Sequence, residues 1–215
     1  MNLYKKNVPA LIERLKTEYP AGDNSCLSFE KPHELLFSVR LAAQCTDERV
    51  NKITPALFNR YPELKDYAAA DQSELESYIR SCGFFRVKAA DIIECSRVLL
   101  SRFDGKIPDN MDDLLSLPGV GRKTANLILG DLFGKPGAVV VDTHCIRLSG
   151  RIGLVPESMK NPEKIEHELR SLLPPEESNS FCHRLVLHGR AVCRAQSPRC
   201  EICCVRDLCR YCKGK

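Results

Sequence analysis

Four cysteines near the end of the chain constrain its fold most strongly, because a folded structure has to bring them together. They are spaced Cys193-x6-Cys200-x2-Cys203-x5-Cys209. Thiols this close in sequence belong either to a metal site or to a disulfide knot. Residues 1–16 are amphipathic and lack the apolar run of a secretory signal, so we expect a cytosolic protein with reduced thiols. A metal site is therefore the favoured interpretation.

The spacing of the four cysteines distinguishes between two kinds of metal centre. Structural zinc sites usually use paired C-x2-C knuckles, whereas this segment has one such pair flanked by longer gaps. Four thiolates wrapping a larger body, such as an iron–sulfur cubane, fit that pattern better. We therefore predict a 4Fe-4S cluster, with zinc as the alternative. Cys204 and Cys212 are interpreted as bystanders, although either could compete for the metal.

Apolar residues recur at helical spacing along most of the chain, which predicts a helical protein. The expected helix starts are marked by capping residues, namely Asn7, Thr46, Asp71, Asp109 and Asn161. The longest periodic run covers residues 88–103, with Leu99 and Leu100 on its apolar side. The strand-like run at 138–141 is too short and too isolated to found a sheet. The sequence therefore predicts an all-α fold.

Charge and hydropathy allow a polyanionic partner and argue against a membrane span. The formal net charge is +4, which permits a nucleic-acid partner without demanding one. No apolar run approaches the roughly 18 residues that a membrane-spanning helix needs. We expect a monomer with no membrane association.

The string LPGVGRKTA at residues 117–125 is the second strong motif. A short apolar helix runs into a Gly-x-Gly turn, and a second helix follows. Gly119 and Gly121 let the backbone approach a ligand closely, and the free N–H groups at the next helix start suit a phosphate oxygen. The string predicts a helix-hairpin-helix that grips nucleic acid without reading its sequence. The alternative is a plain turn in which the glycines only reverse the chain.

Several motifs in order give the chain a family resemblance. The hairpin string, VDTH at 141–144 and the cysteine tail resemble the endonuclease III family of the helix-hairpin-helix DNA glycosylase superfamily. The similarity extends to AQCTD at 43–47 and LHGR at 187–190, so it spans nearly the whole chain.

The resemblance implies two helical lobes with a DNA-binding groove between them. Residues 23–134 would form a helical barrel that ends in the helix-hairpin-helix. Residues 1–22 would fold back onto residues 135–215, which carry the iron–sulfur cluster.

The resemblance also implies a base-excision repair enzyme, a bifunctional DNA glycosylase that removes oxidised or damaged pyrimidines and cleaves the abasic site. The positive helix start and Arg122 disfavour the ammonium form of Lys123, so its amine could attack the sugar C1′ and form a Schiff base that undergoes β-elimination. Asp142 would stabilise oxocarbenium-like charge and help Lys123 lose its proton. The plainer alternatives are phosphate neutralisation by Lys123 and helix capping by Asp142, and the latter is compatible with catalysis.

A base inside a duplex has to flip out before an enzyme reaches its sugar. The resemblance implies that Gln44 hydrogen-bonds the orphaned partner base and that Phe84 is an apolar wedge. The alternative for Phe84 is a core aromatic under a turn. Phe84 replaces a leucine familiar at this place, and Ala42 stands where serine is common, so the lesion and opposite-base preferences stay open.

Further DNA contacts are expected along the phosphate backbone. The hairpin would contribute Gly119, Gly121 and Arg122, while His144 is expected to make no more than a phosphate or backbone contact. Arg194 and Arg199, on the loop between the first two tail cysteines, suit phosphate oxygens.

Two rival functions remain at this point. An adenine-mismatch glycosylase of the same superfamily is disfavoured, because that family lacks a lysine at this hairpin position and carries an extra C-terminal domain. A non-catalytic iron–sulfur DNA-binding protein is disfavoured by the pairing of Lys123 with Asp142. The expected partner is double-stranded DNA with damaged bases or abasic sites, in a bacterial-type cytoplasm and associated with the nucleoid.

Overall fold

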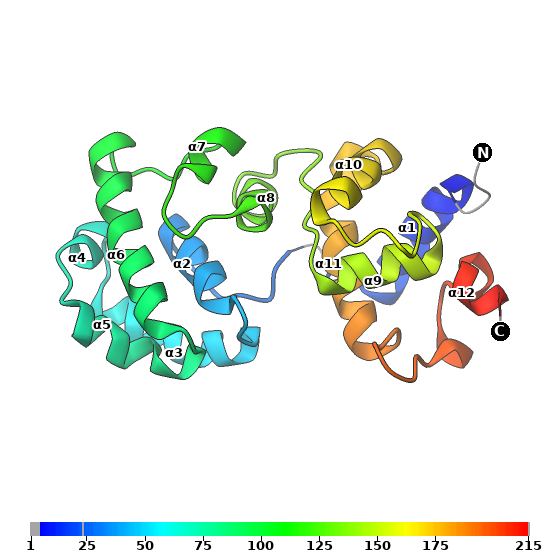
Figure 1. The fold of residues 1–215 in the computed structure, drawn as a ribbon, viewed down its shortest axis with the longest axis horizontal. Helices are drawn as coiled ribbons and strands as arrows, with labels where there is room; N and C mark the ends of the chain where they lie inside the picture. Colours follow the sequence, from blue (N-terminus) through cyan, green and yellow to red (C-terminus); the bar gives the residue numbers. More distant parts are fainter. Residues whose placement is uncertain (1–4, 23, 215) are drawn as a thin grey trace. The chain divides into compact units, whose positions relative to one another are not determined.

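The computed structural model describes residues 5–22 and 24–214, and these residues form helices and loops with no strand among them (Figure 1). The predicted all-α class is confirmed. The chain divides into two compact units, Cys26–Phe133 and a discontinuous unit of Met1–Ser25 with Gly134–Lys215. Of the expected domain boundaries, Asp23 lies outside the described residues, and Gly134 opens the second segment of the discontinuous unit.

The unit Cys26–Phe133 is a bundle of helices in which α6 packs on α4 and α5, while α2 packs on α3 and α8 (Figure 1). Its elements are α2 (Pro32–Ala42), α3 (Asp47–Arg60), α4 (Leu64–Ala68), α5 (Gln72–Ile79), η2 (Arg80–Cys82), α6 (Phe85–Arg102), α7 (Met111–Leu115) and α8 (Arg122–Asp131).

An aromatic cluster forms part of the core of this unit. The rings of Phe37 and Tyr67 meet edge to face with centroids 4.8 Å apart, and Tyr61 lies 5.2 Å from Tyr67. His33 packs against both Phe37 and Tyr67. Burial raises the pKa of Tyr67 far above its usual value. Because the four rings come from α2, α4 and the end of α3, they lock these elements together.

Most of the predicted helix caps are present. The side chains of Thr46, Asp71 and Asn161 each accept a hydrogen bond from the backbone amide three residues on. The prediction for Asp109 is wrong, because the cap of α7 is the next residue. Asn110 has extended backbone angles, and its side-chain oxygen accepts from the third amide of the helix at 3.0 Å.

The longest helix differs from the expected run at its start and on one of its faces. Helix α6 begins at Phe85 rather than at residue 88. Leu99 is fully buried as expected, but Leu100 is 41% exposed. Consecutive residues on a helix point about 100° apart, and at this position Leu99 faces the core while Leu100 points away from it.

The discontinuous unit is built around α11, which packs against both α1 and α9. Asn7 precedes α1 but makes no side-chain cap to it. The elements are η1 (Lys5–Asn7), α1 (Val8–Glu18), α9 (Thr143–Ile152), α10 (Pro162–Leu172), η3 (Pro175–Glu177), α11 (Ser178–Ala191), η4 (Cys200–Ile202), η5 (Arg206–Leu208) and α12 (Arg210–Lys213).

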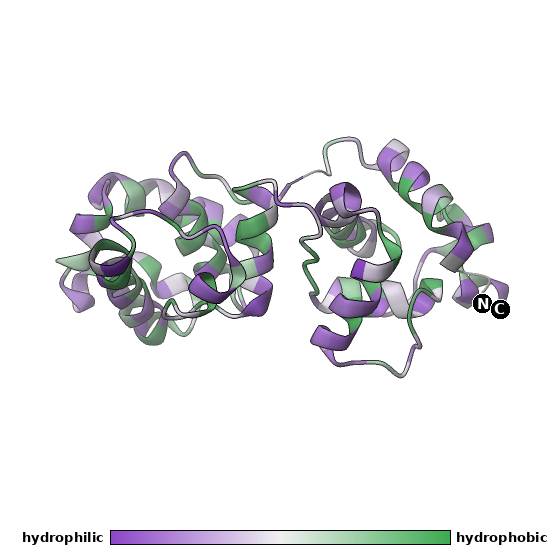
Figure 2. Cartoon of the chain, turned by 90° about the horizontal axis from the view of Figure 1, so that it is seen from above, coloured by the Kyte–Doolittle hydropathy of each residue, from purple (hydrophilic) through white to green (hydrophobic). Residues whose placement is uncertain are grey.

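The helices are amphipathic, and Figure 2 shows apolar and polar segments alternating along them. Helix α1 buries Val8, Leu11, Ile12 and Leu15 on one face, as expected for a helix that covers a core. None of the helices in the described part of the chain is long and apolar enough to cross a membrane.

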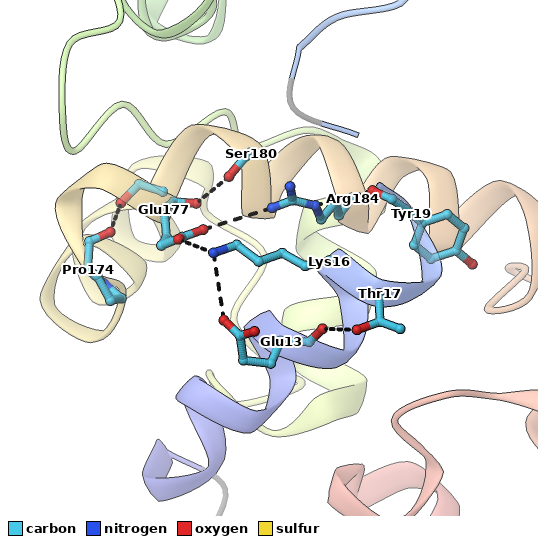
Figure 3. Close-up of polar contacts among 9 residues, drawn as sticks. Glu13, Lys16, Thr17, Tyr19, Pro174, Glu177, Ser180 and Arg184 are labelled. Carbon is cyan, nitrogen blue, oxygen red and sulfur yellow. Dashed lines mark hydrogen bonds and ion pairs between the residues drawn. The ribbon is translucent and has the colours of Figure 1, made fainter. Parts of the chain in front are cut away.

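Charged side chains join α1 to α11, as Figure 3 shows. Lys16 from α1 and Arg184 from α11 both reach the carboxylate of Glu177, which precedes α11. The Arg184 Nε also donates to the backbone oxygen of Tyr19 at 3.4 Å, just after α1 ends. Arg184 is 4% exposed, and a buried charge needs such partners. The N-terminal helix is therefore held on the segment that carries the cysteine tail.

Candidate functional site

The Gly-x-Gly turn lies between α7 and α8, and its first glycine cannot be replaced without strain. Gly119 has φ +72°, and a Cβ there would lie 2.8 Å from Arg40 Nε and 2.9 Å from Asp91 Oδ2. Arg40 comes from α2 and Asp91 from α6, and Arg40 Nε donates to Asp91 Oδ2 at 2.7 Å. The turn therefore rests directly on an ion pair between two core helices.

The second glycine has the opposite character. Gly121 is the N-cap residue of α8, has ordinary extended backbone angles, and makes no side-chain cap. A Cβ at Gly121 would meet nothing within 4 Å, so the space above the helix start is open. The first amides of a helix have no partner within it, and no acidic residue stands in the first turn of α8. This end of α8 is therefore suited to an anionic ligand.

The two predicted catalytic side chains stand at helix starts. Lys123 is exposed in the first turn of α8, in the unit Cys26–Phe133. Asp142 belongs to the discontinuous unit and is the N-cap of α9. Its Oδ1 accepts from the Cys145 amide at 2.7 Å. The capping role expected for Asp142 is thus present, and the cap orients the carboxylate.

The predicted gap-filling residues lie on two loops of the unit Cys26–Phe133. One loop follows the end of α2, and the other precedes the start of α6. Gln44 is exposed with φ +56° between α2 and α3, and Phe84 has φ +47° just before α6. Phe84 is 65% exposed, so the alternative that it is a core aromatic is wrong. Positive φ is unusual for a bulky residue and persists where the surroundings hold it.

His144 is packed against the backbone of α11 rather than standing free. Its Nδ1 lies 3.1 Å from Arg147 Nη2, which also donates to the backbone oxygen of Gly189 at 3.2 Å. A Cβ at Gly189 would collide with His144. The glycine of the LHGR motif is therefore required by the close approach of α9 and α11.

The loop that carries Arg194 and Arg199 is held from α9. The guanidinium of Arg151 donates to the backbone oxygens of Arg194 and Ala195 at 2.7 and 2.8 Å. The side chains of Arg194 and Arg199 remain exposed. Sequence reasoning missed Arg151, because nothing in its local pattern distinguishes a basic helix residue that binds carbonyls from a solvated one.

The four tail cysteines line one small, partly open cavity in the discontinuous unit. All 12 cysteines lie within the described residues and none is in a disulfide, so the disulfide alternative is wrong. Within residues 5–22 and 24–214, no group of three or more suitable side chains is arranged to hold a single metal ion. The four cysteines share this one cavity, as the ligands of a common metal centre do.

Apolar surroundings make this cavity costly for bare thiolates. Leu148, Ile152, Val192 and Val205 contribute to its lining. Burial raises the pKa of Cys203 to about 12. Thiolates in such surroundings need the positive charge of a metal centre, so the donor set fits an iron–sulfur cluster.

Two side chains next to the cysteine sulfurs were not expected from the sequence. Arg151 Nη1 lies 3.5 Å from the sulfur of Cys193, and His188 Nε2 lies 3.4 Å from that of Cys203. Burial lowers the pKa of His188 to about 4, so its ring is neutral. Because the hydroxyl of Tyr19 lies 2.9 Å from the other ring nitrogen and can donate to it, we assign the ring proton to Nε2, facing the sulfur.

The two extra cysteines of the tail differ in position. Cys212 lines the same cavity as the four, whereas Cys204 is not among its lining residues. Arg14 of α1 donates to the backbone oxygen of Cys204 at 3.2 Å.

Comparisons with known proteins identify the family of this chain. Residues 37–175 match the family model described as HhH-GPD superfamily base excision DNA repair protein. The chain belongs to this superfamily, a class of helical DNA repair proteins.

The relatives narrow this membership. Endonuclease III of Synechocystis sp. is 45% identical over 205 residues, covering 95% of this chain and 92% of the relative. The solved structure of a non-covalent endonuclease III–DNA complex matches with a TM-score of 0.90 and 39% identity, covering 98% of this chain and 97% of that chain. A trapped endonuclease III–DNA covalent intermediate matches with a TM-score of 0.89 at the same identity and coverage. Within the superfamily the chain is a member of the endonuclease III family, the DNA glycosylases and abasic-site lyases.

The two hairpin glycines provide a matched pair of variants. We expect Gly119→Ala to lower the free energy of unfolding by about 1–3 kcal/mol, because it adds a side chain at positive φ against Arg40 and Asp91. Gly121→Ala should leave stability unchanged but weaken duplex DNA binding about tenfold, since its methyl group occupies space open to the DNA backbone. Chemical denaturation and binding titrations would check both. Wild-type stability in Gly119→Ala, or wild-type affinity in Gly121→Ala, would contradict this account.

Proposed function

We propose that this chain excises oxidised or damaged pyrimidines from duplex DNA and then incises the strand at the abasic site through a Schiff base on Lys123. The observation that carries the proposal is the exposed side chain of Lys123 in the first turn of α8, two residues after the open hairpin glycine Gly121. A phosphate bound at that helix start would bring the sugar of the same nucleotide within reach of the amine.

Lys123 is the proposed nucleophile. Its free amine attacks C1′ of the everted nucleotide and the damaged base leaves with the electron pair of the glycosidic bond. The sugar ring then opens as the C1′–O4′ bond breaks: O4′ keeps the bonding electrons and takes up a proton, and the lone pair of the lysine nitrogen forms the C1′=N bond of a protonated Schiff base. Removal of a C2′ proton then expels the 3′-phosphate by β-elimination.

Asp142 is proposed to serve the same reaction as a carboxylate. The cap uses its Oδ1 and fixes its orientation. Negative charge near C1′ stabilises the oxocarbenium-like transition state, and a carboxylate can take a proton from the lysine. A capped carboxylate needs no reorganisation when charge develops.

Gln44 and Phe84 are proposed to occupy the space that the everted nucleotide leaves. Both are exposed, and Phe84 presents an apolar ring suited to stack between base pairs. The amide of Gln44 can donate to and accept from the orphaned partner base.

Phosphate contacts are proposed to complete the interface. The hairpin contributes Gly119, Gly121 and Arg122, and the loop held by Arg151 contributes the exposed side chains of Arg194 and Arg199. His144 is tied to Arg147 and Gly189, which favours a structural role with at most a phosphate contact.

We further propose that Cys193, Cys200, Cys203 and Cys209 hold a 4Fe-4S cluster. When bound, the cluster supplies a cross-link between the end of α11 and the closing loops of the chain. Arg151 holds the loop between Cys193 and Cys200 by donating to its backbone carbonyls. His188 donates a hydrogen bond to the sulfur of Cys203. Free cysteines throughout the chain are in keeping with a reducing, bacterial-type cytosol, where we expect a monomer that works on the nucleoid.

Borohydride trapping on a duplex with an oxidised pyrimidine tests the nucleophile. Wild-type protein should form a covalent adduct, and Lys123→Ala should form none because the Schiff base cannot arise. Lys106→Ala, which removes another exposed lysine of the same unit, is the matched control and should trap like wild type. If wild type binds but never traps, the chain is a DNA-binding protein without lyase activity.

Asp142→Asn separates capping from charge. Asparagine caps helices as well as aspartate does, so the thermal unfolding midpoint should not change. The rate of base release under single-turnover conditions should fall about 100-fold, because the carboxylate charge is lost. An unchanged rate would reduce Asp142 to a helix cap.

Metal analysis tests the cluster. The purified protein should be brown and contain about four irons per chain, and Cys200→Ser should lose both colour and iron. Cys204→Ser, whose side chain is absent from the cavity lining, should keep them. Stoichiometric zinc in a colourless protein would overturn the assignment.

A further inference from the structure

A lysine is buried inside the unit Cys26–Phe133, where a surface residue would be expected. Lys88 lies on α6 and is 1% exposed. Its Nζ donates to the backbone oxygen of Leu41 at 2.9 Å and to that of Cys82 at 2.8 Å. Lysines are almost never fully buried unless they are paired, and burial lowers the pKa of Lys88. These two hydrogen bonds therefore define what the side chain does in the fold.

Both carbonyls stand at the ends of helices. Leu41 is in the last turn of α2, and Cys82 is the last residue of η2. The final carbonyls of a helix have no partner within it and attract a cation. Lys88 sits one turn into α6, and a helical side chain leans back toward the N-terminus, so its ammonium group reaches both ends at once.

Each carbonyl lies at the base of a loop that carries a proposed gap-filling residue. Gln44 follows Leu41 after two residues, and Phe84 follows Cys82 after one. Both residues have positive φ and exposed side chains. Such backbone is retained only where neighbours hold it in place. The lysine is therefore a shared anchor for two strained loops.

A second contact joins the same two loops. Burial and the neighbouring thiol of Cys45 raise the pKa of Cys82, so the two thiols lie next to each other. Cys45 directly follows Gln44, and Cys82 is separated from Phe84 only by Gly83. The two loops thus approach each other directly as well as being linked through Lys88.

We infer that Lys88 is a positioning residue that holds Gln44 and Phe84 at a fixed separation, so that both enter the duplex together when a nucleotide is everted. This inference rests on the proposed roles of Gln44 and Phe84. Lysine suits the task because its ammonium has three donors on a flexible stem. Lys88 itself need not touch DNA or take part in the chemistry of Lys123.

Abasic sites in duplex and in single-stranded DNA should respond differently to the loss of Lys88. A duplex with an abasic site presents a gap and an orphaned base, whereas a single strand with an abasic site presents neither. Losing the anchor should therefore harm the duplex reaction and spare the single-stranded one. General damage to the fold would harm both.

Lys88→Met tests this, because it keeps an apolar stem of similar length and removes both hydrogen bonds. In the free protein, amide hydrogen exchange should accelerate in both the 43–46 and the 82–85 loops. Incision of the duplex abasic site should slow about 10- to 100-fold, as expected when reacting groups are misplaced, while incision of the single strand should stay at the wild-type rate. Adding Gln44→Ala to Lys88→Met should slow the duplex reaction little further, since the two residues act as one unit.

Ser96→Ala is the matched control on the same helix. Ser96 is fully buried and its hydroxyl donates to the Ile92 oxygen at 2.8 Å, so this variant loses a buried hydrogen bond without affecting either loop. It should show no selective loss on the duplex. If Lys88→Met fails to fold, Lys88→Gln retains an amide with two donors and should show a smaller loss in the same direction.

Wild-type exchange rates in both loops of a folded Lys88 variant would overturn the inference, as would equal slowing on duplex and single strand. The proposed function is judged separately, through Gln44→Ala alone in the wild-type background. If that variant processes the duplex at the wild-type rate, the gap-filling role of Gln44 is wrong, and the inference that Lys88 serves it falls too. The trapping result for Lys123 would be untouched by either outcome.

Discussion

The position of the start of α8 depends on the contact between the turn at Gly119 and the ion pair of Arg40 with Asp91. The ion pair bridges α2 and α6, with both side chains only about a fifth exposed (22% and 23%). The turn approaches it so closely that a Cβ has no room. The turn that leads into α8 is therefore held against both α2 and α6.

The same two helices lead into the loops that carry Gln44 and Phe84. Helix α2 ends just before Gln44, and α6 begins just after Phe84. The ion pair of Arg40 with Asp91 and the hydrogen bond from Lys88 to Leu41 thus connect α2 and α6 at two places. Helices α2 and α6 therefore support both the turn before Lys123 and the loops of the proposed gap-filling residues. An enzyme that acts on an everted nucleotide needs such groups held in fixed positions.

The other unit uses arginines to organise irregular chain. Arg147 and Arg151 on α9 donate to carbonyls around the first tail cysteine. Loop backbone without helical partners would otherwise be left unsatisfied. Because α9 also carries Asp142 at its start, one helix supports both the proposed carboxylate and the cysteine loop.

Local signals in the sequence predicted much of this. Periodicity and capping residues such as Thr46 and Asp71 act within a single helix turn, so the helices could be read directly. The hairpin and the cysteine spacing were likewise local. The prediction that Asp109 caps α7 was wrong because Asp109 and Asn110 are both residues that commonly cap helices. Only packing decides between them, and the cap is Asn110.

Long-range contacts could not be read in the same way. Lys88 looks like any charged helix residue until α2 and η2 place two carbonyls beside it. Phe84 is a large apolar residue of the kind usually found in a core, and only the folded chain shows that it is exposed. His188 and Arg151 acquire their roles only when α9, α11 and the tail meet.

The central claim is that the amine presented by the hairpin is the one that bonds to the sugar. Peptide mapping by mass spectrometry, after borohydride reduction and nuclease digestion of the trapped complex, tests it most directly. The account predicts the deoxyribose remnant on the peptide that contains Lys123. A remnant on any other amine of the chain would contradict it.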